Sequence, residues 1–128
     1  MGKTEKERIG NFLKEFKKIA TQGRGIDLIS RRKNLESLAG LGLTKQNCRD
    51  EILSLSVADY CSGPKPDRDR PGKIWEFGKT IVAREIYIKL KIAQVGTEKI
   101  AKCLSFHAAE FPLHFPCREG FKKGGDEK

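Results

Sequence analysis

Apolar and polar side chains alternate along EIYIKLKIA, residues 85–93. Because successive side chains of a β-strand point to opposite faces, Ile86 and Ile88 line one face. Tyr87 and Lys89 line the other. The pattern predicts a half-buried strand whose apolar face contacts the protein core. The opposite face carries a phenol and ammonium groups, for which solvation is the simplest interpretation.

Two more strands are predicted around this stretch. KIWEFG at 73–78 precedes the central strand, REIYIKLKIA at 84–93, and KIAKCLSFH at 99–107 follows it. QVGTE, which joins the last two, has the length of a hairpin turn, and its Gly96 can adopt a positive φ. The simplest arrangement of the three is an antiparallel meander.

The N-terminal part of the chain is predicted to be mostly helical. Apolar residues recur at helical spacing over 4–22, and IDLISRR at 26–32 favours a short strand. NLESLAGLGL at 34–43 predicts a short helix, and Thr44 is the expected N-cap of another, followed by a turn that starts at Ser56. Helices that precede strands predict an α+β domain, with N-terminal helices packed on one face of a C-terminal antiparallel β-sheet and the other face open.

Length and composition favour one domain. The chain has 128 residues and is 38% hydrophobic, which suits a single core. We assign residues 1–117 to the domain and the polar residues 118–128 to a flexible tail. No apolar run approaches the roughly 20 residues of a membrane span, and no secretory signal is evident. We expect a cytoplasmic protein with no membrane partner, whose four cysteines are free thiols.

The chain is strongly basic. Lysine and arginine number 26 against 17 acidic residues, a net charge of +9. Residues 1–33 and 64–91 carry nearly all of this excess, so these segments are the candidates for contacting an anion.

The sequence SGPKPDRDRPGK at 62–73 is predicted to be a long loop. It contains three prolines and two glycines, which do not suit the interior of a strand or a helix. Loops of this length in compact domains are often functional or disordered, and the alternation of Asp with Arg or Lys favours a solvated or ligand-facing segment. Lys65, Arg68, Arg70 and Lys73 are therefore candidate RNA-binding residues.

Alternation along the three strands assigns side chains to the two faces of the sheet. The set predicted to face the helices is Trp75, Phe77, Ile86, Ile88, Leu90, Leu104 and Phe106. The outward set is Glu76, Tyr87, Lys89, Lys91, Cys103, Ser105 and His107. Neighbouring strands lie about 4.8 Å apart, so outward side chains on adjacent strands can reach one another.

The outward set could cleave RNA without a metal. The reaction needs a base for the 2′-hydroxyl, cations for the charge on the pentacoordinate phosphate, and an acid for the departing 5′-oxygen. His107 can change charge near neutral pH unaided, and Glu76 could act as the base or orient His107. Lys89 and Arg84 could hold the phosphate. Tyr87 could donate a hydrogen bond or stack on a base.

Plainer interpretations stay open. The lysines could form a solvated stripe or a passive binding surface, His107 could simply be exposed, and Glu76 could form an ordinary cross-strand ion pair.

Cys103, His107, His114 and Cys117 have a spacing that suggests zinc. Residues four apart in a strand, however, lie about 13 Å apart, whereas zinc ligands lie roughly 2.0–2.3 Å from the metal. We expect neither a metal nor another cofactor.

Five short motifs follow one another along the chain. They are LGL at 41–43, LSLSVADY at 53–60, IWEF at 74–77, EIYIKLKI at 85–92 and CLSFH at 103–107. Their order and spacing resemble those of the MqsR-type toxins of bacterial toxin–antitoxin modules. The resemblance implies a RelE-like fold and an mRNA interferase, a metal-independent endoribonuclease that cuts single-stranded mRNA, free or ribosome-associated, until a cognate antitoxin binds it.

The resemblance also implies roles for individual residues. The family's functional tyrosine and its accompanying lysine fall on Tyr87 and Lys89. A family glutamine falls on Glu76 and a family lysine on His107, so both positions depart from the family. A histidine and a carboxylate are nonetheless a more usual acid–base pair than a lysine and a glutamine.

A further family lysine falls near Ser62 and is absent, although Lys65, Arg68 or Lys73 could reach in from the loop. The leading hypothesis is a ribonuclease toxin that inhibits translation. The alternatives are a non-catalytic RNA- or ribosome-binding domain, and an interaction module whose acidic protein partner covers the basic face.

Overall fold

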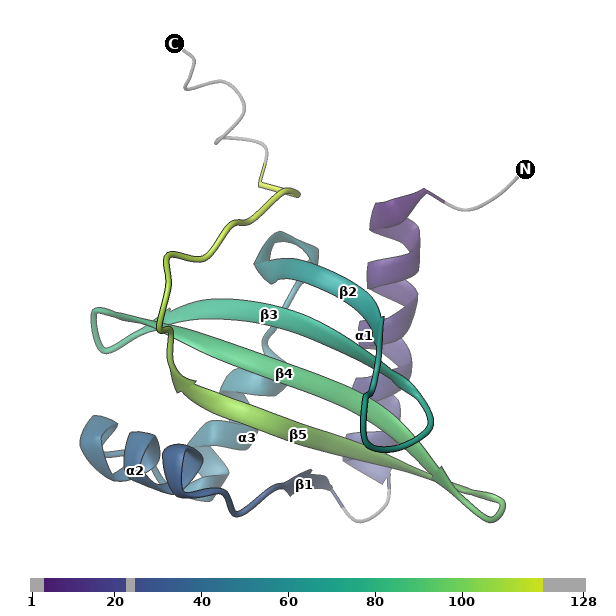
Figure 1. Cartoon of the computed structure of the whole chain (residues 1–128), viewed down its shortest axis with the longest axis horizontal. Coiled ribbons are helices and arrows are strands. Elements are labelled where there is room, and N and C mark those ends of the chain that lie inside the picture. Colours follow the sequence, from purple (N-terminus) through teal and green to yellow (C-terminus); the bar gives the residue numbers. More distant parts are fainter. Residues whose placement is uncertain (1–3, 23–24, 119–128) are drawn as a thin grey trace, which may run out of the picture.

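The computed structural model describes residues 4–22 and 25–118 of the chain. Its elements, in order, are α1 Glu5–Gln22, β1 Ile26–Leu28, α2 Arg32–Leu41, α3 Lys45–Leu53, the 3₁₀ turn η1 Val57–Asp59, β2 Tyr60–Pro66, β3 Lys73–Ile81, β4 Arg84–Val95 and β5 Glu98–Ala108. In Figure 1, α1 and α3 lie behind the sheet and α2 lies beside β5. The predicted α+β class, with helices before most of the strands, is confirmed.

The sheet has five strands in the order β1-β5-β4-β3-β2. The four strands from β2 to β5 are antiparallel, but β1 pairs parallel to β5. The prediction of a purely antiparallel sheet is therefore wrong. No hairpin joins β1 to β5, because α2 and α3 follow β1 directly, so its direction is not fixed by a turn.

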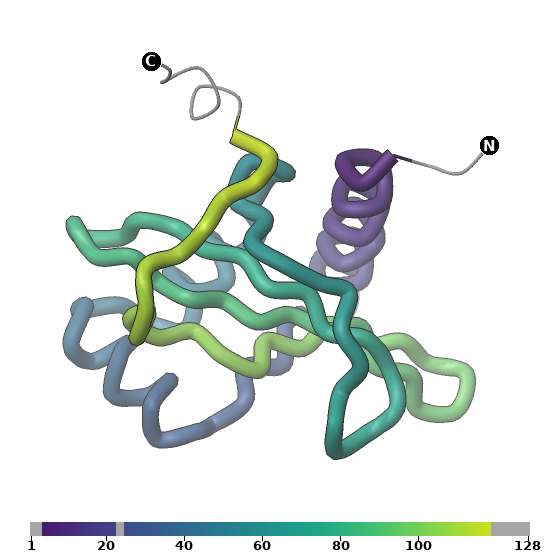
Figure 2. The backbone as a smooth tube through the Cα atoms, turned by 45° about the horizontal axis from the view of Figure 1, so that its top comes forward, coloured from purple at the N-terminus to yellow at the C-terminus, as the bar shows by residue number. Residues whose placement is uncertain are grey.

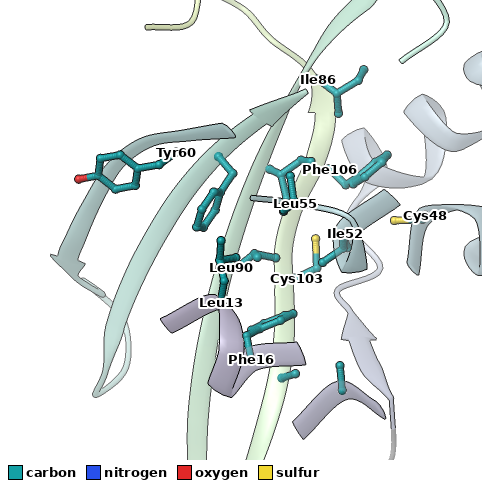
Figure 3. Close-up of a cluster of buried hydrophobic side chains, with 14 of the residues drawn as sticks. Leu13, Phe16, Cys48, Ile52, Leu55, Tyr60, Ile86, Leu90, Cys103 and Phe106 are labelled. Carbon is teal, nitrogen blue, oxygen red and sulfur yellow. The ribbon is translucent and has the colours of Figure 1, made fainter. Parts of the chain in front are cut away.

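The core lies between the sheet and the helices. The side of α1 that faces it consists of Ile9, Phe12, Leu13, Phe16 and Ala20, all buried. Phe12 stacks on Trp75 of β3 with 4.7 Å between ring centroids. Figure 3 shows Leu13 and Phe16 gathered with Leu90 of β4 in this core.

Caps and turns fix the ends of the helices. The Thr44 hydroxyl accepts a 3.0 Å hydrogen bond from the Asn47 N–H, and the Asn47 side chain accepts one from the Thr44 N–H. This reciprocal capping box confirms the predicted N-cap of α3. Gly42 ends α2 with a φ of 71°, a left-handed conformation that glycine adopts without strain. Ser56 precedes the turn that was predicted to begin there.

Part of the predicted loop at 62–73 is a strand. β2 continues to Pro66 along the edge of the sheet, with register shifts on both sides of Ser62. An edge strand tolerates proline because half of its N–H groups need no ladder partner. At Gly63 the φ is 112°, and an added Cβ would lie 2.7 Å from the Ile74 carbonyl oxygen, so the close pairing with β3 requires glycine. The loop itself is limited to residues 67–72.

A β-bulge in β5 changes which side chains face the core. Lys89 pairs with Ser105, but Leu90 pairs with Cys103, so Leu104 is the extra residue. Of the described residues, the core includes Cys103 and not Leu104. The predicted orientations of these two residues are therefore wrong, because strict alternation fails across a bulge.

Asn34 of α2 holds this bulge in place. Its amide nitrogen donates to the carbonyl oxygens of Ile29 at 2.9 Å and Leu104 at 3.1 Å, and its oxygen accepts from the Phe106 N–H at 3.0 Å. The register of β1 along β5 ends at Leu28 opposite Cys103. Asn34, which is fully buried, thus satisfies backbone groups of β5 that no strand covers.

Candidate active site on the open face of the sheet

Four of the predicted site residues lie together on the sheet face opposite the helices. Lys89 of β4 pairs across the sheet with Glu76 of β3 and Ser105 of β5. One step along the same face, Tyr87 pairs with His107. The predicted juxtaposition of Glu76, Tyr87, Lys89 and His107 is thus present in the structure.

Glu76 is the centre of a hydrogen-bond network. The Tyr87 hydroxyl donates to its Oε2 at 2.6 Å, and the Lys65 ammonium donates to its Oε1 at 3.1 Å. The Ser62 hydroxyl also donates to Oε1. Burial raises the pKa of Glu76, but these hydrogen bonds outweigh it and lower the pKa. Glu76 is therefore ionised at neutral pH and is a weak base.

Tyr87 is held as a proton-bearing donor. Burial raises its pKa, and the hydrogen bond to Glu76 raises that pKa further. On its other side, Tyr87 packs against His107, with 5.4 Å between ring centroids and 44° between ring planes. Tyr87 consequently contacts both Glu76 and His107.

The backbone orients His107. Its Nδ1 lies 3.0 Å from the carbonyl oxygen of Ala108. Because a carbonyl oxygen can only accept, Nδ1 is the donor in this contact, and Nε2 is left for another partner. The hydrogen bonds of Glu76 go to Ser62, Lys65 and Tyr87, so Glu76 is not the group that orients His107.

Lys89 is a cation of this face that has no carboxylate partner among the described residues. Its half-buried ammonium forms no hydrogen bond or ion pair with another described residue. Together with Tyr87 and His107, it lines a cavity of about 450 Å³. A cation at the wall of a partly enclosed cavity is well placed to stabilise negative charge on a bound molecule.

Arg84 is not brought into this cavity. Arg84 lies two residues before Ile86 on β4, so the two share a face of the strand. It lines a different cavity, of about 250 Å³, together with Leu41 of α2. His107 lines both cavities, but Arg84 lines only the smaller one and Lys89 only the larger one. The structure therefore does not place Arg84 and Lys89 around one common anion.

A buried ion pair fastens the loop at 67–72 to the open face. The Lys91 ammonium lies 2.6 Å from Asp67 Oδ2, and Lys91 is only 3% exposed. The interpretation of the outward lysines as a solvated stripe is therefore wrong for Lys91, because alternation along a strand does not reveal a loop that folds over it. The Lys91 hydrogen bond, with one from the Asp69 N–H, lowers the pKa of Asp67 to about 2.

The basic side chains of the loop fall into two groups. Lys65 is engaged with Glu76. Arg68, Arg70 and Lys73 are exposed and form no side-chain hydrogen bond or ion pair with the part of the chain described here. In Figure 2 the loop projects from one end of the sheet. These three cations remain available to an anion on this side of the molecule.

The C-terminal segment after β5 covers the other end of the open face (Figures 1 and 2). Leu113 and Phe115 lie on Gly78 of β3, where an added Cβ would be 2.4 Å from Leu113 Cδ1. Arg118 donates to the Ala58 carbonyl at 3.0 Å, and its guanidinium lies 3.6 Å from the centroid of the Phe115 ring. Arg118 is thus held in the domain and not in a flexible tail. The rest of the predicted tail, 119–128, lies outside the described residues.

Sequence reasoning missed several residues around the site. Ser62 bonds to Glu76 only because β2 is a strand, and Arg31 and Phe111 line the cavity from outside the predicted three-stranded meander. Cys61 lies near enough to Glu76 to feel its charge. Burial, with that charge, raises the pKa of the Cys61 thiol to about 11, so it is protonated at neutral pH and is not an activated nucleophile.

The site brings the imidazole of His107, the phenol of Tyr87 and the ammonium of Lys89 around one cavity. Among residues 4–22 and 25–118, no group of three or more His, Cys, Asp or Glu side chains is arranged to hold a metal ion. None of the described helices combines the length and apolarity needed to cross a membrane.

No protein-family model, curated protein or solved structure matches the chain.

Proposed function

We propose that this protein is a metal-independent endoribonuclease of RelE-like fold, an mRNA interferase that cleaves single-stranded mRNA in the cytoplasm and so inhibits translation. The observation that carries the proposal is the convergence of Tyr87, Lys89 and His107 on one cavity, beside the ionised Glu76. The net charge of +9 supports a polyanionic substrate. The motif resemblance adds a cognate antitoxin that neutralises the protein.

His107 is the acid–base group in this mechanism. Nε2 takes the proton from a ribose 2′-hydroxyl while that oxygen attacks the adjacent phosphorus. The bond from phosphorus to the 5′-oxygen then breaks, and the imidazolium returns the proton to the departing oxygen, directly or through water. The products are a 2′,3′-cyclic phosphate and a 5′-hydroxyl.

Lys89 and Tyr87 act on the phosphate. The ammonium of Lys89 neutralises charge that develops on the pentacoordinate phosphorus, where it is worth more than in bulk water. The raised pKa of Tyr87 makes it a poor proton donor. Its one hydroxyl proton, which is donated to Glu76 in the free protein, turns to a phosphate oxygen when RNA binds. Glu76 is a positioning residue, because it holds the Tyr87 hydroxyl in place before the substrate arrives.

Cleavage of a single-stranded mRNA in EDTA tests the proposal. Wild-type protein should cleave it, and His107→Ala should reduce the rate by about 100-fold or more, the usual contribution of general acid–base catalysis. Tyr87→Phe and Lys89→Gln should each reduce it by about tenfold or more.

The matched control is Lys14→Gln, which removes an equal charge from an exposed position on α1, behind the sheet. It should cleave like wild type. No cleavage by wild-type protein, or equal cleavage by the His107 variant, would remove the catalytic role of this face.

A non-catalytic RNA- or ribosome-binding domain is the second candidate. It is favoured by Arg68, Arg70 and Lys73, which are exposed near the same face. This candidate predicts binding that weakens steeply with salt but leaves the RNA intact. An acidic protein that covers the basic face would fit either function, so the cleavage assay separates them.

A further inference from the structure

The cavity at the candidate active site has a second wall that takes no part in the proposed chemistry. One side carries Tyr87, Lys89 and His107, and the other is formed by the segment at 109–113, which follows β5. This segment contributes Phe111, Pro112 and Leu113 to the lining. Polar side chains, two of them on β4, thus line the same cavity as a group of apolar side chains.

The apolar wall is fixed to the domain. The Ala109 N–H donates to the Glu85 carbonyl oxygen at 2.9 Å, and the Leu113 N–H donates to the Glu85 carboxylate at 3.4 Å. The side chain of Leu113 lies directly on Gly78. The segment is therefore held at both of its ends, and the space between the walls is part of the folded structure.

Phe111 stands at the rim of this wall. It is 78% exposed, which is the greatest exposure among the large hydrophobic side chains of the described residues. Burying an aromatic ring is favourable, and folding gains little from a phenylalanine left in water. A bound planar group could therefore stack on its face without displacing packed side chains.

The charges around the cavity leave two cations available. Lys33 also lines it, but an ion pair with Glu110 neutralises that lysine. The Arg31 guanidinium and the Lys89 ammonium form no ion pair with another described residue. A ligand that combines a flat apolar ring with an anionic group would match both walls.

We propose that this cavity binds an unpaired nucleobase of single-stranded RNA, with Phe111 stacked on the base and Lys89 and Arg31 on the adjoining phosphate. The inference rests on the proposed function for its choice of RNA as the ligand. A nucleotide has the required pairing of ring and anion, and stacking on an aromatic side chain requires a base that is not paired in a duplex. Phe111 is thus a substrate-binding residue for single strands.

Binding of a labelled RNA that cannot be cleaved tests this site. The probe is a single-stranded oligonucleotide with 2′-O-methyl groups at every position, and fluorescence anisotropy gives the Kd. Phe111→Ala should raise the Kd by between about 5- and 150-fold, because stacking on one base is worth about 1–3 kcal/mol. Phe111→Tyr keeps the ring and should stay within about twofold of wild type.

Val95→Ala is the matched control, since Val95 is 60% exposed on the β4–β5 hairpin, away from the cavity. It should leave the Kd unchanged. The duplex form of the probe should bind equally to wild type and to Phe111→Ala. An unchanged Kd for Phe111→Ala with the single strand, or an equal loss with both probes, would overturn the base site.

The two proposals fail separately. Binding that depends on Phe111 without cleavage of natural RNA would remove the nuclease and keep the base site. Cleavage that depends on His107, with binding indifferent to Phe111, would keep the nuclease and remove the base site.

Discussion

The Tyr87 hydroxyl reaches from β4 to Glu76 on β3, with 2.6 Å between the phenol oxygen and Oε2. Ser62 and Lys65 donate to the other oxygen of the same carboxylate. Three hydrogen-bond donors, on the strands that flank β3, therefore depend on the negative charge of Glu76. The charge of Glu76 keeps the side chains of Ser62, Lys65 and Tyr87 in their observed positions.

Acidification should weaken the wild-type protein more than the Glu76→Gln variant. Burial raises the pKa of Glu76, but hydrogen bonds from Ser62, Tyr87 and Lys65 prevail and place it below its ordinary value of 4.5. A carboxyl with a depressed folded pKa adds stability above its unfolded pKa, and that stability is lost as pH falls through the folded pKa. Urea unfolding of both proteins at pH values between about 7 and 3 measures this.

The stability advantage of the wild type over Glu76→Gln should shrink below about pH 4.5. Tyr87→Phe removes one donor, so an NMR titration should find a higher pKa for Glu76 in that variant. A stability difference that is constant with pH would contradict the network.

Asn34→Ala should lower the free energy of unfolding by about 3 kcal/mol, because it leaves buried backbone groups without partners. The affected groups are the Leu104 carbonyl and the Phe106 N–H, both at the bulge of β5. Asn11→Ala, at an exposed position of α1, is the control and should change the stability by less than about 0.5 kcal/mol. Equal effects of the two substitutions in urea unfolding would show that Asn34 does not hold the bulge.

Lys91→Met should release the loop at 67–72. The substitution leaves Asp67 without the ammonium group that lies 2.6 Å away, beneath Gly72. Limited trypsin digestion followed by mass spectrometry should find faster cleavage after Arg68.

The control for this release is Lys99→Met, because Lys99 forms an exposed ion pair with Glu15. Exposed pairs contribute little to stability. Cleavage at the loop should therefore stay at the wild-type rate in the control. The same rate in Lys91→Met would mean that other contacts hold the loop.

Alternation along β4 was sufficient to predict the faces of Tyr87 and Lys89, because a strand with one buried face has a strongly specified register. The position of His107 beside Tyr87 followed from the hairpin that joins β4 to β5. Cys103 was assigned to the wrong face, because the bulge at Leu104 depends on hydrogen bonds from Asn34 of α2, which local sequence does not reveal.

The cavity could not be predicted from the strands at all. One of its walls belongs to the segment around Phe111, which has no periodic pattern and takes its place through contacts with Glu85 and Gly78. Lys91 and Asp67 are likewise 24 residues apart in sequence. Such contacts depend on tertiary packing, which single-sequence patterns do not encode.

The turn between β3 and β4 offers a stabilising change. Val82 and Ala83 both have positive φ, 52° and 61°, where side chains with a Cβ are strained. Two-residue turns of this kind favour Asn-Gly. Val82→Asn combined with Ala83→Gly should therefore raise the free energy of unfolding by about 1–2 kcal/mol in urea titrations. Val95→Asn, at the exposed end of β4, is the control and should not stabilise the protein. A double variant that unfolds at the wild-type urea concentration, or below it, would show that the turn carries no such strain.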